Sequence, residues 1–322
     1  MSVGHPVVSV VMANYNGARH LNAALDSVLN QTLSDLELIV VDDVSTDESV
    51  AVLQTRARLD SRLTVLPQPR NQGPAAARNR GLDAARGRWI AIVDSDDELA
   101  PDRLACLVAR AAADGARIVA DNQMVFTETG AFEPYPMLPP DRFAAPVWIT
   151  PAQFIEGGVM YGPGPDFGYL KPLIERSLLA ELRYDESLRI GEDYDLLLRL
   201  MLRAGRLRLE PAALYRYRKH PQSISHRLTP AALTDMLTAQ DRFRAEFPNR
   251  APELREALTR RARSLEKARA YETVISGLKE GAIVSSLMSA VGQPQIWALL
   301  TQPLRARLDR FAAARRQSTV RA

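Results

Sequence analysis

The sequence predicts an α/β protein whose central, mostly parallel sheet lies between helices. Four short apolar runs rich in Val and Ile, at residues 7–13, 36–41, 63–66 and 89–93, alternate with amphipathic helical patterns. This β-α-β-α-β-α-β order implies right-handed crossovers and parallel strands. Three of the four runs also end in polar clusters, and open sheets of this kind bind ligands at the carboxyl ends of their strands. We therefore expect these clusters to form one site.

Each helix between these strands has its own start signal or apolar face. The first follows the polar segment 14–17 and repeats Leu and Val between residues 21 and 29. The second begins after Ser-Thr-Asp-Glu at 45–48, which offers capping groups. The third is the Ala-rich segment 73–85, which leads into the fourth strand. No G-x-G-x-x-G follows the first strand and the sequence contains no P-loop, which argues against both of those nucleotide-binding folds.

The fourth strand is followed by three acids within four residues, in Asp94-Ser95-Asp96-Asp97. Asp94 and Asp96 are two positions apart, so both carboxylates can converge on one divalent cation where the chain leaves the strand. Hard oxygen ligands suit Mn2+ or Mg2+, which would in turn bind the diphosphate of a nucleotide. The alternative is a polar loop that caps the next helix, since Asp is common at such positions.

A second acidic group, Glu192-Asp193-Tyr194-Asp195, opens a leucine-rich helical pattern. The helix dipole favours negative charge in a first turn, and for Glu192 and Asp195 this alone is a sufficient explanation.

Four separated segments carry a recognisable combination of motifs: Val-Ser-Val-Val-Met-Ala-Asn-Tyr-Asn at 8–16, Asp-Asp with Ser-Thr-Asp at 42–47, Asn-Gln-Gly-Pro with Ala-Arg-Asn at 71–79, and the acids at 94–97. Their order and spacing resemble those of family 2 glycosyltransferases of the GT-A fold. The resemblance covers roughly residues 7–220.

The resemblance implies a role for individual residues of these motifs. Asp193 would be the catalytic base of an inverting transfer, with Glu192 orienting it or touching the acceptor. Asp96, together with Asp94, would bind the metal, Mn2+ or Mg2+. The residues that would contact the donor nucleotide or its sugar and diphosphate are Ala13, Tyr15, Asp43, Gly73, Arg78, Asp94, Ser95 and His220.

Side-chain chemistry supports several of these roles independently. A carboxylate such as Asp43 accepts from a base N–H, and Tyr15 can stack on a base. Arg78 supplies a planar cation for a phosphate or an acid. The structural alternatives are that Tyr15 covers the end of the sheet and that Arg78 forms an ion pair with Asp42.

Two further segments fit the same picture. Residues 215–226 combine Arg and Lys side chains with His220 and His226. This segment can close over the diphosphate or reach the metal. The alternative is a solvated basic edge strand followed by a turn. Residues 157–168 contain five glycines and two prolines, which is typical of an acceptor lid or sugar-contact loop.

Composition sets the domain organisation and the compartment that we expect. The chain has 322 residues and one cysteine, Cys106, so it forms no intrachain disulfide, and no signal peptide precedes residue 7. We expect a cytoplasmic protein. Residues 1–228 form the GT-A catalytic domain, with a nucleotide-sugar half at 1–125 and an acceptor half at 126–228, and residues 229–322 form a helical appendage.

The C-terminal region differs in charge from the rest of the chain. From residue 241 onward there are 16 Lys and Arg against 8 Asp and Glu, and residues 281–304 carry no charge but are interrupted by Gly-Gln-Pro-Gln. This stretch is too polar and broken to span a membrane. It predicts an interfacial anchor on an anionic membrane; the alternative is a helical bundle that packs on the catalytic domain or on a second subunit as a homo-oligomer. The basic side chains that would flank the anchor are Arg305, Arg307, Arg310, Arg315 and Arg316.

The sequence therefore predicts a metal-dependent inverting glycosyltransferase that moves a hexose from a UDP-sugar to a lipid-linked saccharide in bacterial exopolysaccharide biosynthesis. We expect it on the inner face of the plasma membrane, with no nucleic-acid partner, since the basic tail lacks interleaved aromatics. Residues 119–122 and 168–173 resemble succinoglycan-type glucosyltransferases, which favours glucose. The alternatives are UDP-galactose, UDP-N-acetylhexosamine or GDP-mannose as donor, or a non-catalytic nucleotide-sugar-binding subunit of a membrane assembly.

Overall fold

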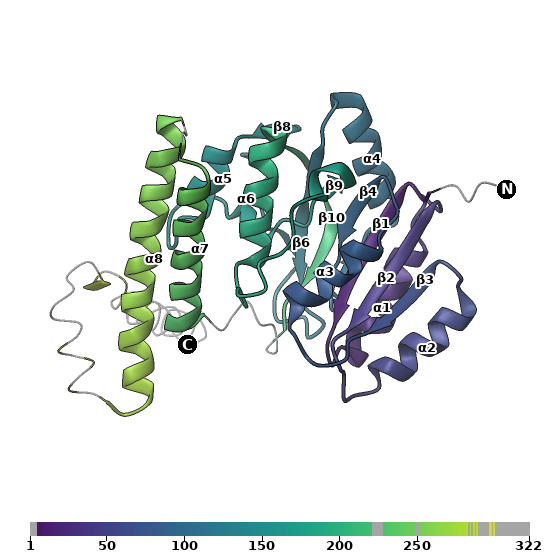
Figure 1. The fold of residues 1–322 in the computed structure, drawn as a ribbon, viewed down its shortest axis with the longest axis horizontal. Helices are drawn as coiled ribbons and strands as arrows, with labels where there is room; N and C mark the ends of the chain where they lie inside the picture. The colour runs from purple at the N-terminus through teal and green to yellow at the C-terminus, as the bar shows by residue number, and fades with distance from the viewer. Residues whose placement is uncertain are drawn as a thin grey trace, which may run out of the picture.

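The computed structural model describes residues 5–220, 228–248 and 251–282, together with positions 284, 286, 288, 296, 297 and 299. In this part of the chain one ten-stranded sheet has helices on both faces (Figure 1). The order of strands along the sheet is β3-β2-β1-β4-β9-β6-β10-β5, while β7 pairs with β6 and β8 with β10.

The first half of the sheet is parallel, as the sequence predicts. It comprises β3 (Leu63–Pro67), β2 (Leu36–Asp42), β1 (Val8–Asn14) and β4 (Trp89–Ile92). Every residue of β2 is buried, which explains its unbroken apolar run, because a parallel strand is covered on both faces. Asn14 lies opposite Asp42, so the polar ends of β1 and β2 meet at one edge.

Helices α1 (Ala18–Leu29), α2 (Ser49–Leu59) and α3 (Pro74–Ala84) connect these strands. Side chains of β1 alternate between two cores: Val10 packs with α1 and Val11 packs with α3. The helix α3 approaches the sheet closely, since a Cβ on Gly81 would lie 2.4 Å from a methyl group of Val11. This close packing accounts for the run of small residues in α3.

The second half of the sheet is mixed. Strand β9 (Leu173–Glu175) is antiparallel to both β4 and β6 (Ile118–Phe126), whereas β6 is parallel to β10 (Leu207–Arg218). The sheet is therefore parallel from β3 to β4 and again between β6 and β10, and the antiparallel β9 separates these two parts. The remaining elements of this part are β5 (Glu98–Leu99), β7 (Tyr135–Pro136), β8 (Val147–Ile149), the 3-10 turns η1 (Phe167–Tyr169) and η2 (Arg176–Leu179), and the helices α4 (Arg103–Asp114), α5 (Pro151–Gly157) and α6 (Glu192–Ala204).

Helices α7 (Pro230–Glu246) and α8 (Pro252–Lys279) lie side by side and α8 packs on α5 (Figure 1). Phe243 of α7 and Leu258 of α8 belong to the same core as the leucines of α6. Up to residue 279, the C-terminal helices therefore pack on the catalytic domain, which is the alternative to a membrane anchor. The domain boundary at residue 228 stays a prediction.

Several residues in the predictions for the tail lie outside the part of the chain that the structure describes. Arg305, Arg307, Arg310, Arg315, Arg316 and the interruption at 292–295 lie outside the described residues, as does His226. Within the described part, no helix combines the length and apolar character needed to cross a membrane.

Candidate active site

The carboxyl ends of β1 and β2 are joined by side-chain hydrogen bonds. Asp42 Oδ1 accepts from Asn14 Nδ2 at 2.8 Å and from the Ser45 hydroxyl at 2.6 Å, and Asp42 is almost fully buried. Arg78 is not among its partners but contacts Asp94 and Glu192. The alternative of an Arg78–Asp42 ion pair is therefore wrong, because Asp42 instead accepts hydrogen bonds at the ends of β1 and β2.

Asp43 organises the loop that precedes α3. Its carboxylate accepts from the backbone N–H of Gln72 at 2.9 Å and of Gly73 at 2.7 Å. Gly73 has φ of 87°, in the region that glycine favours. Tyr15, at the neighbouring edge, is 54% exposed and so contributes little to covering the sheet, which leaves its ring available to a ligand.

The acids after β4 form a cluster but have different surroundings. Asp94, Asp96 and Asp97 each offer a carboxylate oxygen within 4.8 Å of the others. Asp97 is buried and accepts from the Tyr215 hydroxyl and the Arg218 backbone N–H, both at 2.7 Å. Burial, reinforced by Asp96 and Asp94, raises the pKa of Asp97 well above its ordinary value. Asp97 thus connects the end of β10 to this loop.

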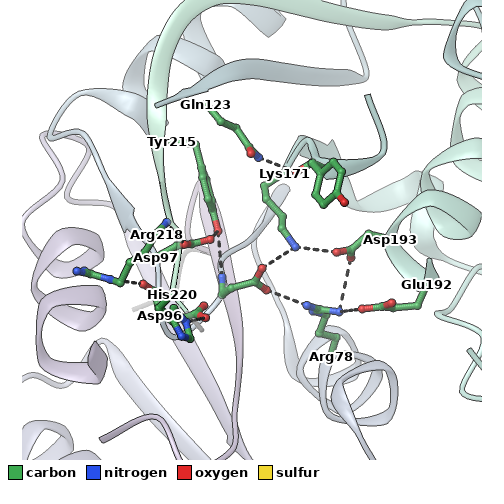
Figure 2. Close-up of polar contacts among 12 residues, drawn as sticks. Arg78, Asp96, Asp97, Gln123, Lys171, Glu192, Asp193, Tyr215, Arg218 and His220 are labelled. Carbon is green, nitrogen blue, oxygen red and sulfur yellow. Dashed lines mark hydrogen bonds and ion pairs between the residues drawn. The ribbon is translucent and has the colours of Figure 1, made fainter. Parts of the chain in front are cut away.

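Asp96 is the more accessible acid of this cluster and faces His220. Its side chain is 34% exposed, and its Oδ2 lies 2.8 Å from Nε2 of His220 (Figure 2). His220 follows β10, whose last residue Arg218 is buried and donates to the Asp96 carbonyl at 2.7 Å. Strand β10 lies inside the sheet between β6 and β5. The alternative of a solvated basic edge strand at residues 215–218 is therefore wrong.

Two buried cations bridge Asp94 to the start of α6. Arg78 donates to Asp94 Oδ1 at 2.8 Å and to Glu192 Oε1 at 2.7 Å. Lys171 Nζ lies 2.7 Å from both Asp94 Oδ2 and Asp193 Oδ2 (Figure 2). Burial alone would raise the pKa of Asp94, but the charges of Lys171 and Arg78 lower it far below its ordinary value.

The pKa values of the two neighbouring acids at the start of α6 shift in opposite directions. Burial, followed by the charge of Asp193, raises the pKa of Glu192. Burial acts on Asp193 in the same sense, but Arg78 and Lys171 outweigh it and lower the pKa of Asp193. Such divergence between adjacent carboxyls is typical of sites where each has a separate chemical role. Asp195 instead pairs with Arg199 on the same helix, at 2.6 Å, in a structural role.

The structure therefore brings most of the predicted residues to one edge of the sheet. Arg78 pairs with Asp94, Glu192 and Asp193, and the Asp96–His220 pair lies beside this group in the acidic cluster. Asp43 and Gly73 contact each other after β2, and the exposed Tyr15 follows the neighbouring strand β1. Ala13, in β1, and Ser95, between the acids, lie along the same edge.

Comparison with known proteins assigns the family. The family model described as glycosyl transferase family 2 matches residues 9–179. The chain is also 38% identical over 312 residues to the succinoglycan biosynthesis protein ExoO of Rhizobium meliloti (strain 1021), covering 96% of this chain and 88% of ExoO. The chain belongs to glycosyl transferase family 2. It is a glycosyltransferase related to succinoglycan biosynthesis enzymes.

Solved structures confirm the GT-A fold of this glycosyltransferase. S. aureus TarS 1-349 in complex with UDP-GlcNAc superposes with a TM-score of 0.62 at 22% identity, covering 80% of this chain and 71% of that one. The mannosyltransferase PcManGT from Pyrobaculum calidifontis, in complex with GDP-Man and Mn2+, gives a TM-score of 0.59 at 19% identity, covering 94% and 83%. At such identities the likeness concerns the fold.

Sequence reasoning assigned no role to three residues that the structure places in this network. Lys171 lies between Asp94 and Asp193. The hydroxyl of Tyr215 donates a hydrogen bond to Asp97, and Tyr184 forms a side-chain hydrogen bond with Asp193. A lysine inside the otherwise apolar segment 170–174 is a signal that was available for Lys171. Local patterns give no comparable signal for the tyrosines, which look like ordinary core residues.

Proposed function

We propose that this protein is a metal-dependent, inverting glycosyltransferase that moves a hexose, preferably glucose, from a UDP-sugar to a lipid-linked saccharide acceptor in bacterial exopolysaccharide biosynthesis. The proposal rests mainly on Asp193, whose carboxylate contacts the ammonium group of Lys171 and lies near the acidic cluster of Asp94 and Asp96. An inverting transfer needs both a base and a group that accommodates a departing diphosphate.

The donor nucleotide would bind along the ends of β1 and β2. The exposed Tyr15 ring is suited to stack on a base, and the buried Asp43 shapes the Gly73 loop beside it. Both Asp43 oxygens already accept backbone N–H groups, so a base N–H would share one of them. Ala13 and Ser95 would line the same strand ends, and Arg78 would contact the sugar or the diphosphate.

The acidic cluster fits a divalent metal such as Mn2+ or Mg2+. Asp96 has the exposed carboxylate, and His220 adds an imidazole that Mn2+ accepts as a ligand. Both oxygens of Asp94 are engaged by Arg78 and Lys171, so Asp94 would share its charge between these cations and the metal. A bound metal would neutralise charge on the leaving diphosphate. PcManGT, of the same fold, was solved with Mn2+.

Asp193 would act as the general base. It would take the proton of the acceptor hydroxyl while that oxygen forms a bond to the anomeric carbon and the bond to the nucleoside diphosphate breaks on the opposite face. Its lowered pKa keeps the carboxylate ionised and ready to accept. Glu192 would orient the network through Arg78, which it contacts at 2.7 Å.

The second half of the chain would contact the acceptor and the membrane. The Gly-rich segment 157–168 connects α5 to η1, and its residue Asp166 caps η1. In the C-terminal region Val284, Met288 and Trp297 are 76%, 70% and 50% exposed. Exposed apolar side chains within a cationic tail support contact with an anionic membrane on the cytoplasmic side, with self-association as the alternative.

A donor-hydrolysis screen tests the proposal. Purified protein is incubated with UDP-glucose, UDP-galactose, UDP-N-acetylglucosamine or GDP-mannose, with Mn2+, Mg2+ or EDTA, and nucleotide release is measured. We expect UDP-glucose with Mn2+ to give the highest rate and EDTA to abolish it. Higher turnover of another donor overturns the glucose assignment, and undiminished release in EDTA overturns the metal. UDP binding without turnover of any donor would favour the non-catalytic subunit.

A further inference from the structure

We propose that Lys171 is a positioning residue for the transfer, which keeps the base Asp193 ionised and sets its position relative to the donor-side carboxylate Asp94. The inference rests on the proposed role of Asp193. It assigns to Lys171 a function that neither the sequence motifs nor the family match specify.

The geometry places one ammonium group between two halves of the site. Asp94 follows β4 in the nucleotide half, whereas Asp193 lies in the first turn of α6 in the acceptor half. Lys171 Nζ contacts both at 2.7 Å, and the residue is only 6% exposed (Figure 2). Burial opposes its charge, but the attraction of Asp193 and Asp94 raises the pKa of Lys171 above its ordinary value. One buried ammonium group therefore joins the carboxylates of the two halves.

A buried framework positions the Lys171 backbone. Arg103, fully buried at the start of α4, donates to the Lys171 carbonyl and forms a two-pronged ion pair with Asp121 at 2.7 and 3.0 Å. Gln123 donates to the Tyr169 carbonyl, two residues before Lys171, at 2.6 Å. Burying an ion pair carries a large desolvation penalty that only good geometry offsets. Here that geometry fixes the segment that carries Lys171.

The charge balance around Asp193 shows what Lys171 contributes. The groups that face Asp193 are Lys171 before β9, Arg78 on α3, Asp94 after β4, and Tyr184 and Glu192 before and on α6. Two cations thus serve three carboxylates. Without Lys171, the cation nearest to Asp193 would be Arg78, which lies 3.6 Å from Asp193 and pairs with Glu192 at 2.7 Å. A buried carboxylate that loses a cation at 2.7 Å retains its proton to higher pH.

The test compares Lys171→Met, which removes the charge at similar size, with Lys171→Arg, which keeps it. The pH dependence of kcat/KM is measured by UDP release from the donor found in the screen, and the Asp193 carboxyl is titrated by 13C NMR, assigned from its loss in Asp193→Asn. We expect the acid-side midpoint and the NMR titration to move up by about 1–3 pH units in Lys171→Met. We expect Lys171→Arg to restore most of this shift.

Arg86→Met is the matched control. Arg86 contacts the buried carboxylate of Glu37 at 2.7 Å, at the opposite end of β2, so its loss removes the cation from a buried carboxylate away from the site. Its midpoint should not move. The inference is wrong if folded Lys171→Met keeps the wild-type midpoint of kcat/KM and the wild-type titration of Asp193. If Lys171→Met does not fold, the same two measurements are made on Lys171→Gln, and an unshifted Asp193 titration in that variant also overturns the inference.

Failure of the inference and failure of the proposed base are distinguishable. If Asp193→Asn retains wild-type turnover, Asp193 is not the base and the role of Lys171 falls with it. If Asp193→Asn is inactive while Lys171→Met keeps the wild-type pH profile, only the Lys171 inference is wrong.

Discussion

Nε2 of His220 lies 2.8 Å from Oδ2 of Asp96, although the two residues are 124 positions apart in the chain. Asp96 follows β4 and His220 follows β10, and the buried Arg218, which donates to the Asp96 carbonyl, holds these two segments together. The contact adds an imidazole to the acidic cluster, at its exposed carboxylate.

Asp96→Ala should abolish the enhancement of UDP binding by Mn2+ while leaving the fold intact, because Asp96 is partly exposed and its loss opens no core cavity. Calorimetry of UDP binding with and without Mn2+ measures this. Asp26→Ala is the control, since Asp26 forms a surface pair with Arg56 away from the strand ends. Metal-enhanced UDP affinity that persists in folded Asp96→Ala would contradict the assignment.

Asp193→Asn should lower kcat by about 100-fold or more, because an amide of the same size does not accept the acceptor proton. UDP affinity should stay within a few-fold of wild type. Asp195→Asn, one helical turn from the same N-terminus and paired with Arg199, should keep most activity. If Asp193→Asn turns over normally, the base lies elsewhere, and Glu192 is the next residue to test.

Glu37→Gln should destabilise the protein near neutral pH by roughly 1–2 kcal/mol, because hydrogen bonds to a charged carboxylate are lost. Burial would raise the pKa of Glu37, but hydrogen bonds from Ser9 and Arg86 and the Arg86 charge lower it. A folded pKa below the unfolded one gives stability that is present above the unfolded pKa of 4.5 and is lost as the pH falls through the folded value.

The destabilisation by Glu37→Gln should therefore shrink as the pH falls below about 4.5. Denaturant unfolding of both proteins at pH 7 and pH 3.5 provides the comparison. A difference in the free energy of unfolding that is the same at both pH values would show that the carboxylate charge contributes nothing here.

The C-terminal region should bind anionic liposomes in a salt-sensitive manner, since each Lys or Arg near such a surface contributes about 1 kcal/mol. Truncation after Gly277 keeps α7 and nearly all of α8, including the core contact of Leu258, so donor hydrolysis should continue. Liposome co-sedimentation and most activity on a lipid-linked acceptor should be lost. Neutral liposomes serve as the control.

Two results would refute the membrane role. Full-length protein that ignores anionic liposomes at low salt shows that the tail has another partner. A truncated protein that unfolds shows that the tail is part of the core, and size measurements in solution would then test self-association.

The parallel half of the fold was predictable because its signals are local. Each of β1, β2 and β4 is a buried apolar run, and the chain then emerges at the carboxyl end of the sheet with polar residues. The parallel arrangement alone brings Asn14, Asp42 and Asp94 to one edge. The acidic run that contains Asp96 also stands out locally after β4, whereas the role of Asp193 follows from the resemblance to family 2 glycosyltransferases.

Tertiary structure alone decided the second half of the sheet and the electrostatics of the site. Strand β9 has three residues and pairs antiparallel with strands far away in the chain, which no local periodicity encodes. Lys171 acquires its role only because Asp94 and Asp193, from different halves of the chain, both lie 2.7 Å from its ammonium group. A sequence specifies which side chains carry charge, but pKa values depend on distance and burial, and these are set when the chain packs.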